Sequence, residues 1–534
     1  MTKRRRDRRP PTKPSPRPAP ASPAADRLDR PGGAPGREER TAAAALVVTV
    51  LVGIALRLSE LFQPMDYDEA FTWVYFAARP LRQALSDYSL PNNHLFHTLL
   101  VHGAAALLGN RPWVLRLPAF LAGVALIPTT YFLCRRLFGS PAGILAAALV
   151  ACAPSLVDYS ANARGYTIVC LAFAGTLTLA ARILIEDRTR DWILFVAVSA
   201  AGLYTIPTML YAFGGAALWL LLEIGIDTEP PRRGLLLSRA GISVATIGAL
   251  TAAAYAPIWT RSGWGVLFSK GSGSPSWPLF RTTMAASLAD VWRQWNEDIP
   301  AIGAVVLSLA FLSGVVLHRR LSPYRISPAL VSFLFPILPL LFQRVVPFTR
   351  VWLYLLPLYF ATAAAAIGAA AGRLPAFRRP RRETQNLAVL ALAFVVVAGM
   401  GTRVFASSRA RFAEPARVDW ICDFLAPQLQ KGDLVAAHGY WATPIAYYLL
   451  RKDLAFERIS TDWTLEVLQV TDVPKGATRD ASPRPPRTFL VVRAGDEPTL
   501  EAIRQKTQAA GASAEMTVLR KFGTTTVYEV GLVR

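Results

Sequence analysis

Long blocks of apolar residues without a single charged side chain dominate this sequence. Residues 192–222 and residues 351–371 are two examples. A stretch of about 18 or more apolar residues is long enough to cross a lipid bilayer as a helix. Because several such blocks follow one another, the chain is expected to cross a membrane many times. Only 18% of its residues are charged, against about 25% in soluble domains, which argues against a soluble protein.

About eleven membrane-spanning helices are expected. They are predicted near residues 43–62, 114–133, 142–157, 167–184, 192–206, 207–222, 237–259, 300–317, 325–343, 351–371 and 387–403. Lys and Arg collect in cytoplasmic loops. With the amino terminus inside, five basic segments fall on that side: Arg135–Arg136, Arg188–Arg190, Arg232–Arg233, Arg319–Arg320 and Arg378–Arg382. The net charge of +22 is therefore attributed to the inner membrane face, and no nucleic-acid partner is expected.

The segments that flank the spans differ from them in composition. Residues 1–41, rich in Arg, Pro and Ala, are expected to form a disordered cytoplasmic tail. Residues 42–403 form the predicted membrane domain. Residues 404–534 are more polar and alternate helix-like with strand-like stretches, which is typical of a small α/β domain on the outer side. Its strands are predicted near residues 433–437, 488–492, 516–519 and 525–530.

The segment from His94 to Leu108 does not fit the simple scheme. It is apolar but short, and it carries three histidines. Counting it as a span would reverse every later loop and move the basic segments outside. We therefore expect a helix that lies in the outer membrane interface.

Three carboxylates follow the first predicted span within four residues, namely Asp66, Asp68 and Glu69. Charged residues often mark the place where a helix leaves the membrane, and this is the simplest interpretation. A carboxylate pair at an interface also suits general-base chemistry, because a low dielectric and a like-charged neighbour raise a carboxyl pKa. Both interpretations stay open from position alone.

Arginines stand at the outer ends of two predicted spans. Arg164 lies in the turn at residues 158–166, and Arg350 precedes the tenth span. A guanidinium group bonds two phosphate oxygens at once and stays charged. The alternative is an arginine that only reaches the headgroups, against which the inner bias of positive charge argues. Arg116 lies within the apolar sequence of a predicted span, so we expect it to pair with an acidic residue of an outer loop.

Five motifs in this order resemble the GT-C superfamily, specifically the branch with protein O-mannosyltransferases and the lipid A aminoarabinose transferase. They are Asp68-Glu69, Asn93-His94-Leu95-Phe96, Arg116-Leu117-Pro118, the turn Tyr159–Tyr166, and Arg350 with Tyr354-Leu355-Leu356-Pro357. The resemblance covers residues 43–403. The second motif lacks the family's prolines after His94, and the last is stretched between Arg350 and Tyr354.

The resemblance implies a glycosyltransferase that takes a hexose or pentose from a polyprenyl-phosphate carrier. The acceptor would be a glycan, lipid or protein at the outer face of a bacterial plasma membrane. No metal or other cofactor is expected, since an arginine pair can serve the leaving phosphate. The implied residues are Asp68 as base with Glu69 beside it and Asp66 as runner-up, Arg350, Arg164 and Tyr354 for the phosphate, and Asn93, His94 and Tyr166 in the substrate loops.

Two other functions remain as alternatives. A transporter or flippase of a lipid-linked sugar would be built from inverted repeats with matching broken spans, and the sequence has no clear pair of that kind. A non-catalytic scaffold with the outer domain as a binding module would give no reason for acids and arginines to gather on one side of the membrane.

Overall fold

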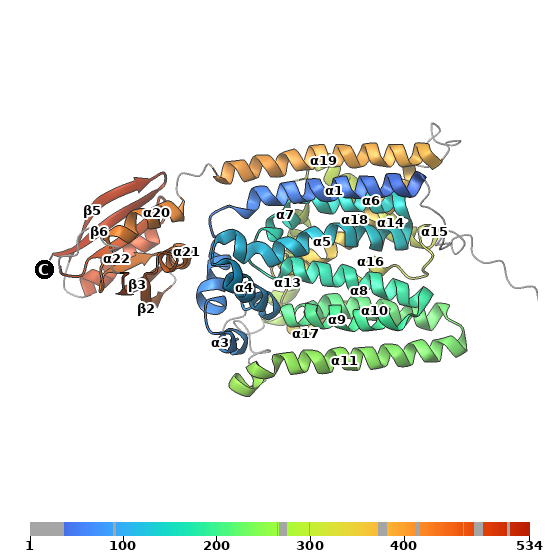
Figure 1. Ribbon diagram of the computed structural model, residues 1–534, viewed down its shortest axis with the longest axis horizontal. Coiled ribbons are helices and arrows are strands. Elements are labelled where there is room, and N and C mark those ends of the chain that lie inside the picture. Colours follow the sequence, from blue (N-terminus) through green and yellow to red (C-terminus); the bar gives the residue numbers. More distant parts are fainter. Residues whose placement is uncertain are drawn as a thin grey trace, which may run out of the picture.

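The computed structural model describes residues 37–88, 92–263, 265, 275–297, 299–371, 382–412, 417–462, 464–474, 484–509 and 513–533. Within these residues the chain forms a bundle of roughly parallel and antiparallel helices with a sheet domain at one end (Figure 1). Most of the predicted tail at residues 1–41 lies outside the described residues, as does Arg378 of the fifth basic segment.

The bundle contains long α-helices, short connecting α-helices, a π-helix and a 3-10 helix. The elements are α1 (Arg37–Leu61), α2 (Tyr67–Thr72), the π-helix η2 (Trp73–Ala77), α3 (Leu81–Ser86), α4 (Leu95–Leu108), α5 (Pro112–Phe138), α6 (Ser140–Cys152), α7 (Pro154–Ser160), α8 (Tyr166–Glu186), α9 (Thr189–Thr205), α10 (Met209–Asp227), α11 (Pro230–Ser262), α13 (Trp277–Asn296), α14 (Ala301–Val316), α15 (His318–Leu321), α16 (Pro328–Leu334), α17 (Ile337–Gln343), the 3-10 helix η3 (Thr349–Leu355), α18 (Leu356–Ala371) and α19 (Arg382–Phe412).

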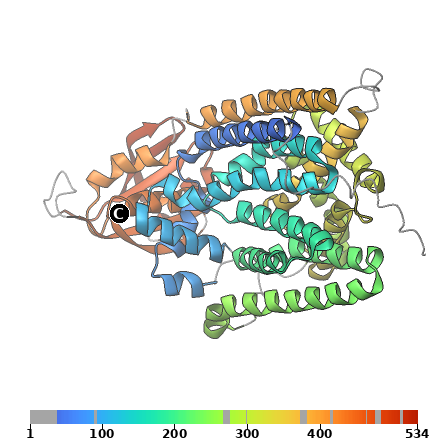
Figure 2. The same cartoon turned by 45° about the vertical axis from the view of Figure 1, so that its right-hand side comes forward.

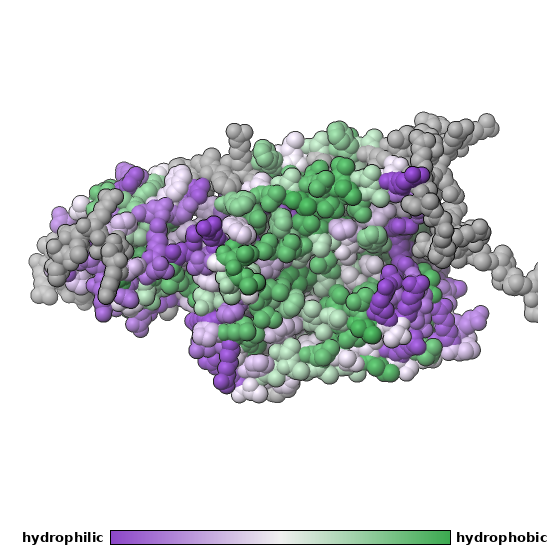
Figure 3. Space-filling model, in the orientation of Figure 1, coloured by the Kyte–Doolittle hydropathy of each residue, from purple (hydrophilic) through white to green (hydrophobic). Residues whose placement is uncertain are grey.

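All eleven predicted spans coincide with helices of the bundle. Among the described residues, six helices are long and apolar enough to cross a membrane, and up to eight if each bent pair is one span. The bent pairs are α6 with α7 and α13 with α14, and shorter apolar helices include α4 and the segment 328–343. The chain is an integral membrane protein, and the face in view in Figure 3 has a hydrophobic middle region between hydrophilic areas at its two ends.

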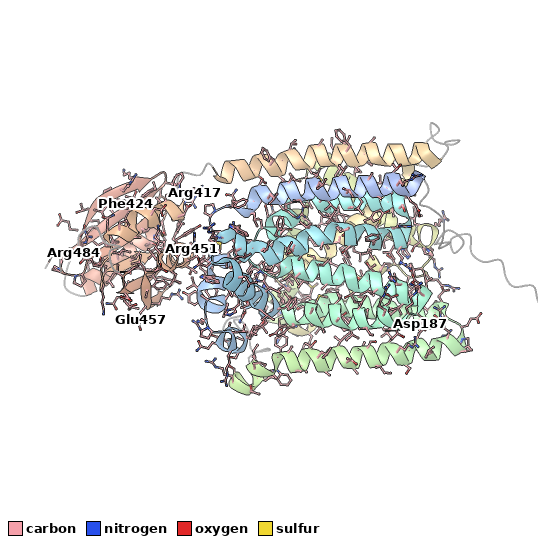
Figure 4. The ribbon with its side chains drawn as sticks, in the orientation of Figure 1. Asp187, Arg417, Phe424, Arg451, Glu457 and Arg484 are labelled. Carbon is pink, nitrogen blue, oxygen red and sulfur yellow. The ribbon has the colours of Figure 1, made fainter. Side chains whose placement is uncertain are left out.

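Four of the five predicted basic segments meet at the end of the bundle opposite the sheet domain. Arg136 Nη2 lies 2.8 Å from Glu186 Oε1. The guanidinium of Arg232 donates to the carbonyl of Leu184 over 2.8 Å. Asp187 lies at this same end (Figure 4). The basic segments therefore share one side of the membrane, as the predicted topology requires.

A buried arginine holds together the break between α6 and α7, whose axes differ by 60°. Pro154 has no N–H, so the carbonyl of Val150 cannot receive its helical hydrogen bond. Arg57 from α1 supplies the donors instead: Nη2 donates to Val150 over 3.2 Å, and Nη1 donates to Ala151 over 2.8 Å. Its Nε donates to Ser160 Oγ over 3.0 Å. Arg57 is fully buried, and it serves as a cap for a helix end inside the bundle.

The sheet domain is a small α/β unit, as the sequence predicts. Its elements are α20 (Val418–Leu425), the 3-10 turn η5 (Ala426–Gln428), β1 (Leu434–Ala437), α21 (Gly439–Leu450), β2 (Ala455–Asp462), β3 (Leu465–Asp472), β4 (Thr488–Arg493), α22 (Glu497–Ala509), β5 (Ser513–Phe522) and β6 (Thr525–Val533). The strand order is β2-β3-β1-β4-β6-β5, and only β1 and β4 pair in parallel among the described strands. The sequence analysis identifies four of these strands and misses the β2–β3 hairpin. Helix α19 continues to Phe412, beyond the predicted boundary at residue 403.

The sheet domain shares a hydrophobic cluster with the head of the bundle. Met65, Ala70 and Leu115 belong to the same cluster as Ile445 and Leu449 of α21. Two tyrosines of α21 fasten the contact, since Tyr447 donates to the carbonyl of Asn110 and Tyr448 accepts from the N–H of Met65. In Figure 2 the domain lies against the blue segment that follows α1. The loop after α1 is therefore held between the bundle and the sheet domain.

Replacing Arg57 by alanine should destabilise the bundle. The change leaves two helix-end carbonyls and a serine hydroxyl buried without their donor, at about 1–3 kcal/mol for each unsatisfied group. The measurement is the Tm of the purified chain in detergent. Arg135→Ala is the matched control, because Arg135 is half-exposed and its pair with Glu39 spans 3.8 Å; such pairs contribute about 0–1 kcal/mol. Equal Tm values for the two variants would contradict the capping role.

Candidate active site

The three carboxylates of the first loop have three different environments. Asp66 caps the amino terminus of α2: its side chain accepts from the N–H of Tyr67 over 2.7 Å, and Glu69 reaches back to the N–H of Asp66. This reciprocal arrangement is a capping box. Burial, followed by the nearby charge of Glu69, raises the pKa of Asp66. Asp66 is therefore a structural cap whose carboxyl also takes up a proton more readily than usual.

Glu69 is buried in an ion pair with Arg116. The Nε and Nη2 atoms of Arg116 contact its two oxygens over 2.7 and 2.5 Å, and each side chain is only 2% exposed. Glu69 Oε1 also accepts from the N–H of Ala163 over 2.7 Å. The expected pairing of Arg116 with an outer-loop acid is confirmed. Because both oxygens of Glu69 are engaged, its geometry is that of a positioning residue beside Asp68.

Asp68 stands between the two predicted arginines. Its Oδ2 atom lies 3.1 Å from Arg164 Nη1 and 3.7 Å from Arg350 Nη1. Asp68 and Arg350 are partly accessible, at 26% and 29%, whereas Arg164 is 2% exposed. Residues from α2, the α7–α8 turn and η3 thus meet in one place. We call Asp68, Arg164, Arg350, His94 and Tyr166 the phosphate cluster, because paired guanidinium groups are the donors that suit phosphate oxygens.

His94 completes this cluster from the amino terminus of α4. Its Nδ1 atom accepts from the N–H of Gly165 over 2.8 Å, so the neutral ring carries its proton on Nε2. That Nε2 lies 3.2 Å from Arg164 Nη2, which is also a donor. Burial, followed by the charge of Arg164, lowers the pKa of His94 well below 6.5. Two donors therefore face each other without an acceptor between them.

Gly165 makes this approach possible. A Cβ atom at position 165 would lie 2.4 Å from Thr205 Cγ2 and 3.2 Å from His94 Nδ1. Any larger residue would push the ring of His94 away from the turn that carries Arg164. The glycine in the predicted turn is thus required by close packing and not by an unusual backbone angle.

Two tyrosines connect the cluster to its surroundings. The hydroxyl of Tyr166 lies 3.4 Å from Arg164 Nη2, and its ring meets the ring of His94 edge-on at 4.9 Å. The ring of Tyr159 lies 5.3 Å from that of Tyr166. Tyr159 also lines a cavity of about 580 Å³ between the first outer loop and the sheet domain. The phosphate cluster therefore adjoins a second space.

Two predicted site residues do not join the cluster. Asn93 is buried and donates to the carbonyls of Ala84 and Asp87 while it accepts from Thr98, so it fastens α3 to α4. Tyr354 is 1% exposed, and its ring packs against that of Phe173 at 5.0 Å. Its hydroxyl has no hydrogen-bond partner among the described residues. The geometry thus gives both residues structural positions.

The sequence analysis does not identify the contribution of the sheet domain. Arg417, Tyr440, Trp441 and Arg493 line the cavity from that side, and Arg417 faces the bundle in Figure 4. No motif in residues 404–534 indicates this role. The one signal in the sequence is the adjacent pair of aromatic residues Tyr440 and Trp441, which the structure places in the first turn of α21. As to metals, no group of three His, Cys, Asp or Glu side chains in the described part of the chain could hold an ion.

Comparisons with known proteins show what the chain and its fold are similar to. Residues 93–255 match the model of the dolichyl-phosphate-mannose-protein mannosyltransferase family. The solved structure of ArnT from Cupriavidus metallidurans in the apo state superposes with a TM-score of 0.59 at 14% identity, over 92% of this chain and 98% of that chain. ArnT from the same organism bound to undecaprenyl phosphate gives a TM-score of 0.58 at 14% identity, over 90% and 97% of the two chains. No curated protein matches by sequence.

The superpositions confirm the predicted fold, and the family match agrees with the resemblance over residues 93–255. The family match begins at Asn93 and therefore includes His94, Arg116 and the turn with Arg164. It does not include Asp68 or Arg350, which join the cluster only through the fold. The roles of these two residues accordingly rest on their positions in the structure.

Acid should destabilise the protein partly through His94. The buried ring stays neutral, whereas the unfolded chain takes up a proton near pH 6.5. Below pH 6.5 protonation therefore favours the unfolded chain, by up to about 1.4 kcal/mol per pH unit. We expect the Tm in detergent to fall between pH 7.5 and 5.5, and to fall less in His94→Gln. His102→Gln is the matched control, and an unchanged slope in His94→Gln would contradict the buried neutral ring.

Proposed function

We propose that this chain is a GT-C-type membrane glycosyltransferase that transfers a sugar from a polyprenyl monophosphate to an acceptor hydroxyl. The family match over residues 93–255 and the fold of ArnT support this proposal. The ArnT structure that contains undecaprenyl phosphate supports the lipid carrier. The comparisons give no support to the alternative of a transporter or flippase.

The observation that carries the proposal is a group of buried N–H donors beside a carboxylate, not all of which have an acceptor among the described residues. The Nε2–H of His94 and the Nη2 of Arg164 face each other, and the Nε of Arg164 has no hydrogen-bond partner among the described residues. A buried donor without an acceptor is costly. A phosphate oxygen placed there would accept from His94 and Arg164 together, and Arg350 would contribute a second cation from the accessible side.

The reaction that fits this site is a direct displacement. The acceptor oxygen attacks the anomeric carbon of the donor sugar, and its proton passes to Asp68. The bond between the anomeric carbon and the phosphate oxygen breaks, and the electron pair leaves with the polyprenyl phosphate as a dianion. Arg164, Arg350 and the Nε2–H of His94 stabilise that charge as it develops. Both arginines contact Oδ2 of Asp68, which leaves Oδ1 for the acceptor proton.

Asp68 is the base in this scheme because the other two carboxylates of the first loop are engaged in structural contacts. Glu69 is held by Arg116, and Asp66 is held as a helix cap. Asp66 remains the runner-up, since it faces the cavity. Tyr354 and Asn93 keep the structural positions described above, while His94 and Tyr166 join the phosphate-binding residues. We propose that no metal is required, because two guanidinium groups and an imidazole N–H already converge on one point.

The distribution of charge supports a proposed orientation in the membrane, and the similarity to known proteins supports a proposed class of sugar. We propose that the basic end of the bundle faces the cytoplasm, because Lys and Arg collect there, and that the phosphate cluster and the sheet domain lie at the outer face of a bacterial plasma membrane. A reporter active only in the cytoplasm should be silent when fused after Arg534. The sugar is a hexose or a pentose, in line with the mannosyl and aminoarabinosyl families above.

Asp68→Asn should abolish most turnover while the protein stays folded. The change keeps the size of the side chain and removes its basicity, and positioned general bases contribute about 10²- to 10⁴-fold. Membranes or detergent preparations are supplied with a polyprenyl-phosphate sugar and an acceptor, and the free polyprenyl phosphate released is quantified. Asp87→Asn is the matched control, since Asp87 pairs with the half-exposed Arg79 in the same outer region. Near-normal turnover in Asp68→Asn would rule out this base and direct attention to Asp66.

Arg350→Ala should weaken use of the donor more than use of the acceptor. Loss of one charge-assisted contact is worth about 1.5–3 kcal/mol, or on the order of 10- to 150-fold in kcat/KM for the donor. Arg350→Lys keeps the charge without the planar fork, so it should lie between wild type and Arg350→Ala.

The control for this series is Arg344→Ala, because Arg344 lies in the same segment but faces Trp277. Donor kinetics that are unchanged in Arg350→Ala would place the phosphate elsewhere. Activity lost on chelation and restored by a divalent ion would overturn the metal-free scheme and make Asp68, Glu69 and Asp158 candidate ligands.

A further inference from the structure

Asp68 lies at the point where the two arginines of the phosphate cluster converge. Its Oδ2 atom is 3.1 Å from Nη1 of Arg164 and 3.7 Å from Nη1 of Arg350. Glu69 and Asp66 do not compete for these arginines, because both have structural partners of their own. A phosphate oxygen that binds both guanidinium groups must approach the same nitrogen atoms, so it competes with the Asp68 carboxylate.

The carboxylate satisfies Arg164 only in part. Although Nη1 lies within ion-pair distance of Asp68, neither Nη1 nor Nε of Arg164 has a hydrogen-bond partner among the described residues. Its Nη2 atom lies 3.2 Å from His94 Nε2, itself a donor, and 3.4 Å from the hydroxyl of Tyr166. Arg164 is only 2% exposed, and buried donors without acceptors are costly. An anion with more oxygen atoms would therefore satisfy Arg164 better than Asp68 does.

The phosphate group becomes a better partner for these donors as the proposed reaction proceeds. The donor is a phosphodiester with a single negative charge, whereas the departing polyprenyl phosphate carries about two charges and three terminal oxygens. Guanidinium groups bind such oxygens two at a time. The attraction of both arginines for the phosphate therefore increases when the bond to the sugar breaks.

The charge of Asp68 changes in the opposite direction. In the proposed transfer this carboxylate takes the acceptor proton and becomes neutral, while the phosphate keeps the electron pair of the broken bond. The negative charge that Asp68 loses thus appears on the phosphate, and the two arginines face the same total charge before and after the transfer. Asp68 is 26% exposed, so its proton passes to water afterwards. Its restored charge then lies beside the product phosphate, and the two anions repel each other.

We propose that Asp68 has a second role, in which it expels the polyprenyl phosphate after the transfer. The inference rests on the proposed glycosyltransferase function and concerns the release of its product. While Asp68 is protonated, Arg164 and Arg350 pair with the phosphate. Once Asp68 has passed its proton to water, its carboxylate competes again for both guanidinium groups and the carrier leaves. One side chain thus serves as the base and then clears the site for the next donor.

The test measures binding of the product to the full-length chain in detergent, without turnover. Undecaprenyl phosphate should bind Asp68→Asn about tenfold more tightly than wild type, or more, mainly because it dissociates more slowly. The amide keeps the size of the side chain but has no charge with which to compete for the arginines. Undecaprenol has the same hydrocarbon tail without the phosphate, and it should bind both chains equally.

Asp87→Asn is the matched control, because it removes a carboxylate from an ion pair with Arg79 in the same outer region. Its affinity for undecaprenyl phosphate should equal that of wild type. The second role of Asp68 is overturned if Asp68→Asn binds undecaprenyl phosphate as wild type does or more weakly. An equal gain in affinity for undecaprenol, or an equal gain in Asp87→Asn, overturns it as well.

The same measurement separates this inference from the proposed function. If neither wild type nor any variant binds undecaprenyl phosphate, the proposed use of a polyprenyl-phosphate donor is wrong. If wild type binds it and Asp68→Asn gains no affinity, only the role in product release is wrong. A merely structural role of Asp68 would weaken binding when the side chain is changed, so a gain in affinity that is confined to the phosphate-bearing lipid supports the proposal.

Discussion

The buried ion pair between Glu69 and Arg116 is the interaction on which the arrangement of the site depends. Arg116 also donates to the carbonyls of Leu61, Gln63 and Pro64, so one guanidinium fixes the end of α1 and the turn into α2. Glu69 in turn accepts from the N–H of Ala163. Asp68 precedes Glu69 in the chain and Arg164 follows Ala163. The pair therefore sets the positions of Asp68, the proposed base, and of Arg164, the proposed phosphate-binding residue, at the same time. Such a pair in a low-dielectric region is stable only when its hydrogen bonds are complete, and here every oxygen of the carboxylate is used.

The membrane explains which parts of the fold could be predicted. Lipid demands that backbone groups be satisfied within the chain, so apolar blocks become helices and their lengths follow from the bilayer. For the same reason an arginine inside a span must find a partner, which predicts the pairing of Arg116. The bias of positive charge then orders the loops, and it correctly brings Asp68, Arg164 and Arg350 to one end. Hydrophobic periodicity cannot show how a helix breaks within the bundle. The break at Pro154 is stable because Arg57, from the distant helix α1, donates hydrogen bonds to the carbonyls at the end of α6.

The roles of the polar segments are harder to predict from sequence, because their contacts depend on individual side chains and not on a periodic pattern. Asn93 and Tyr354 match family motifs in sequence, yet Asn93 holds α3 to α4 and Tyr354 packs in the apolar core. A motif records which residue is present and not which way its side chain turns. The β2–β3 hairpin was missed because its charged residues interrupt the apolar alternation, although Glu466 and Arg458 pair with each other across the hairpin. Likewise, nothing in the sequence of residues 404–534 shows that Tyr440 and Trp441 face the membrane domain, since this depends on how α21 packs against α2.

The docking of the sheet domain completes the logic of the site. The proposed reaction brings a lipid-linked donor from the bilayer and a hydroxyl acceptor from water to one carboxylate. The cavity lies between the first outer loop and the sheet domain, and Tyr159 lines it and contacts Tyr166 of the phosphate cluster. The tyrosine hydroxyls of α21 bond directly to the loop after α1 and to the segment before α5. Any movement of the sheet domain would therefore displace the loop that carries Asp68, so the position of this carboxylate depends on the same few contacts.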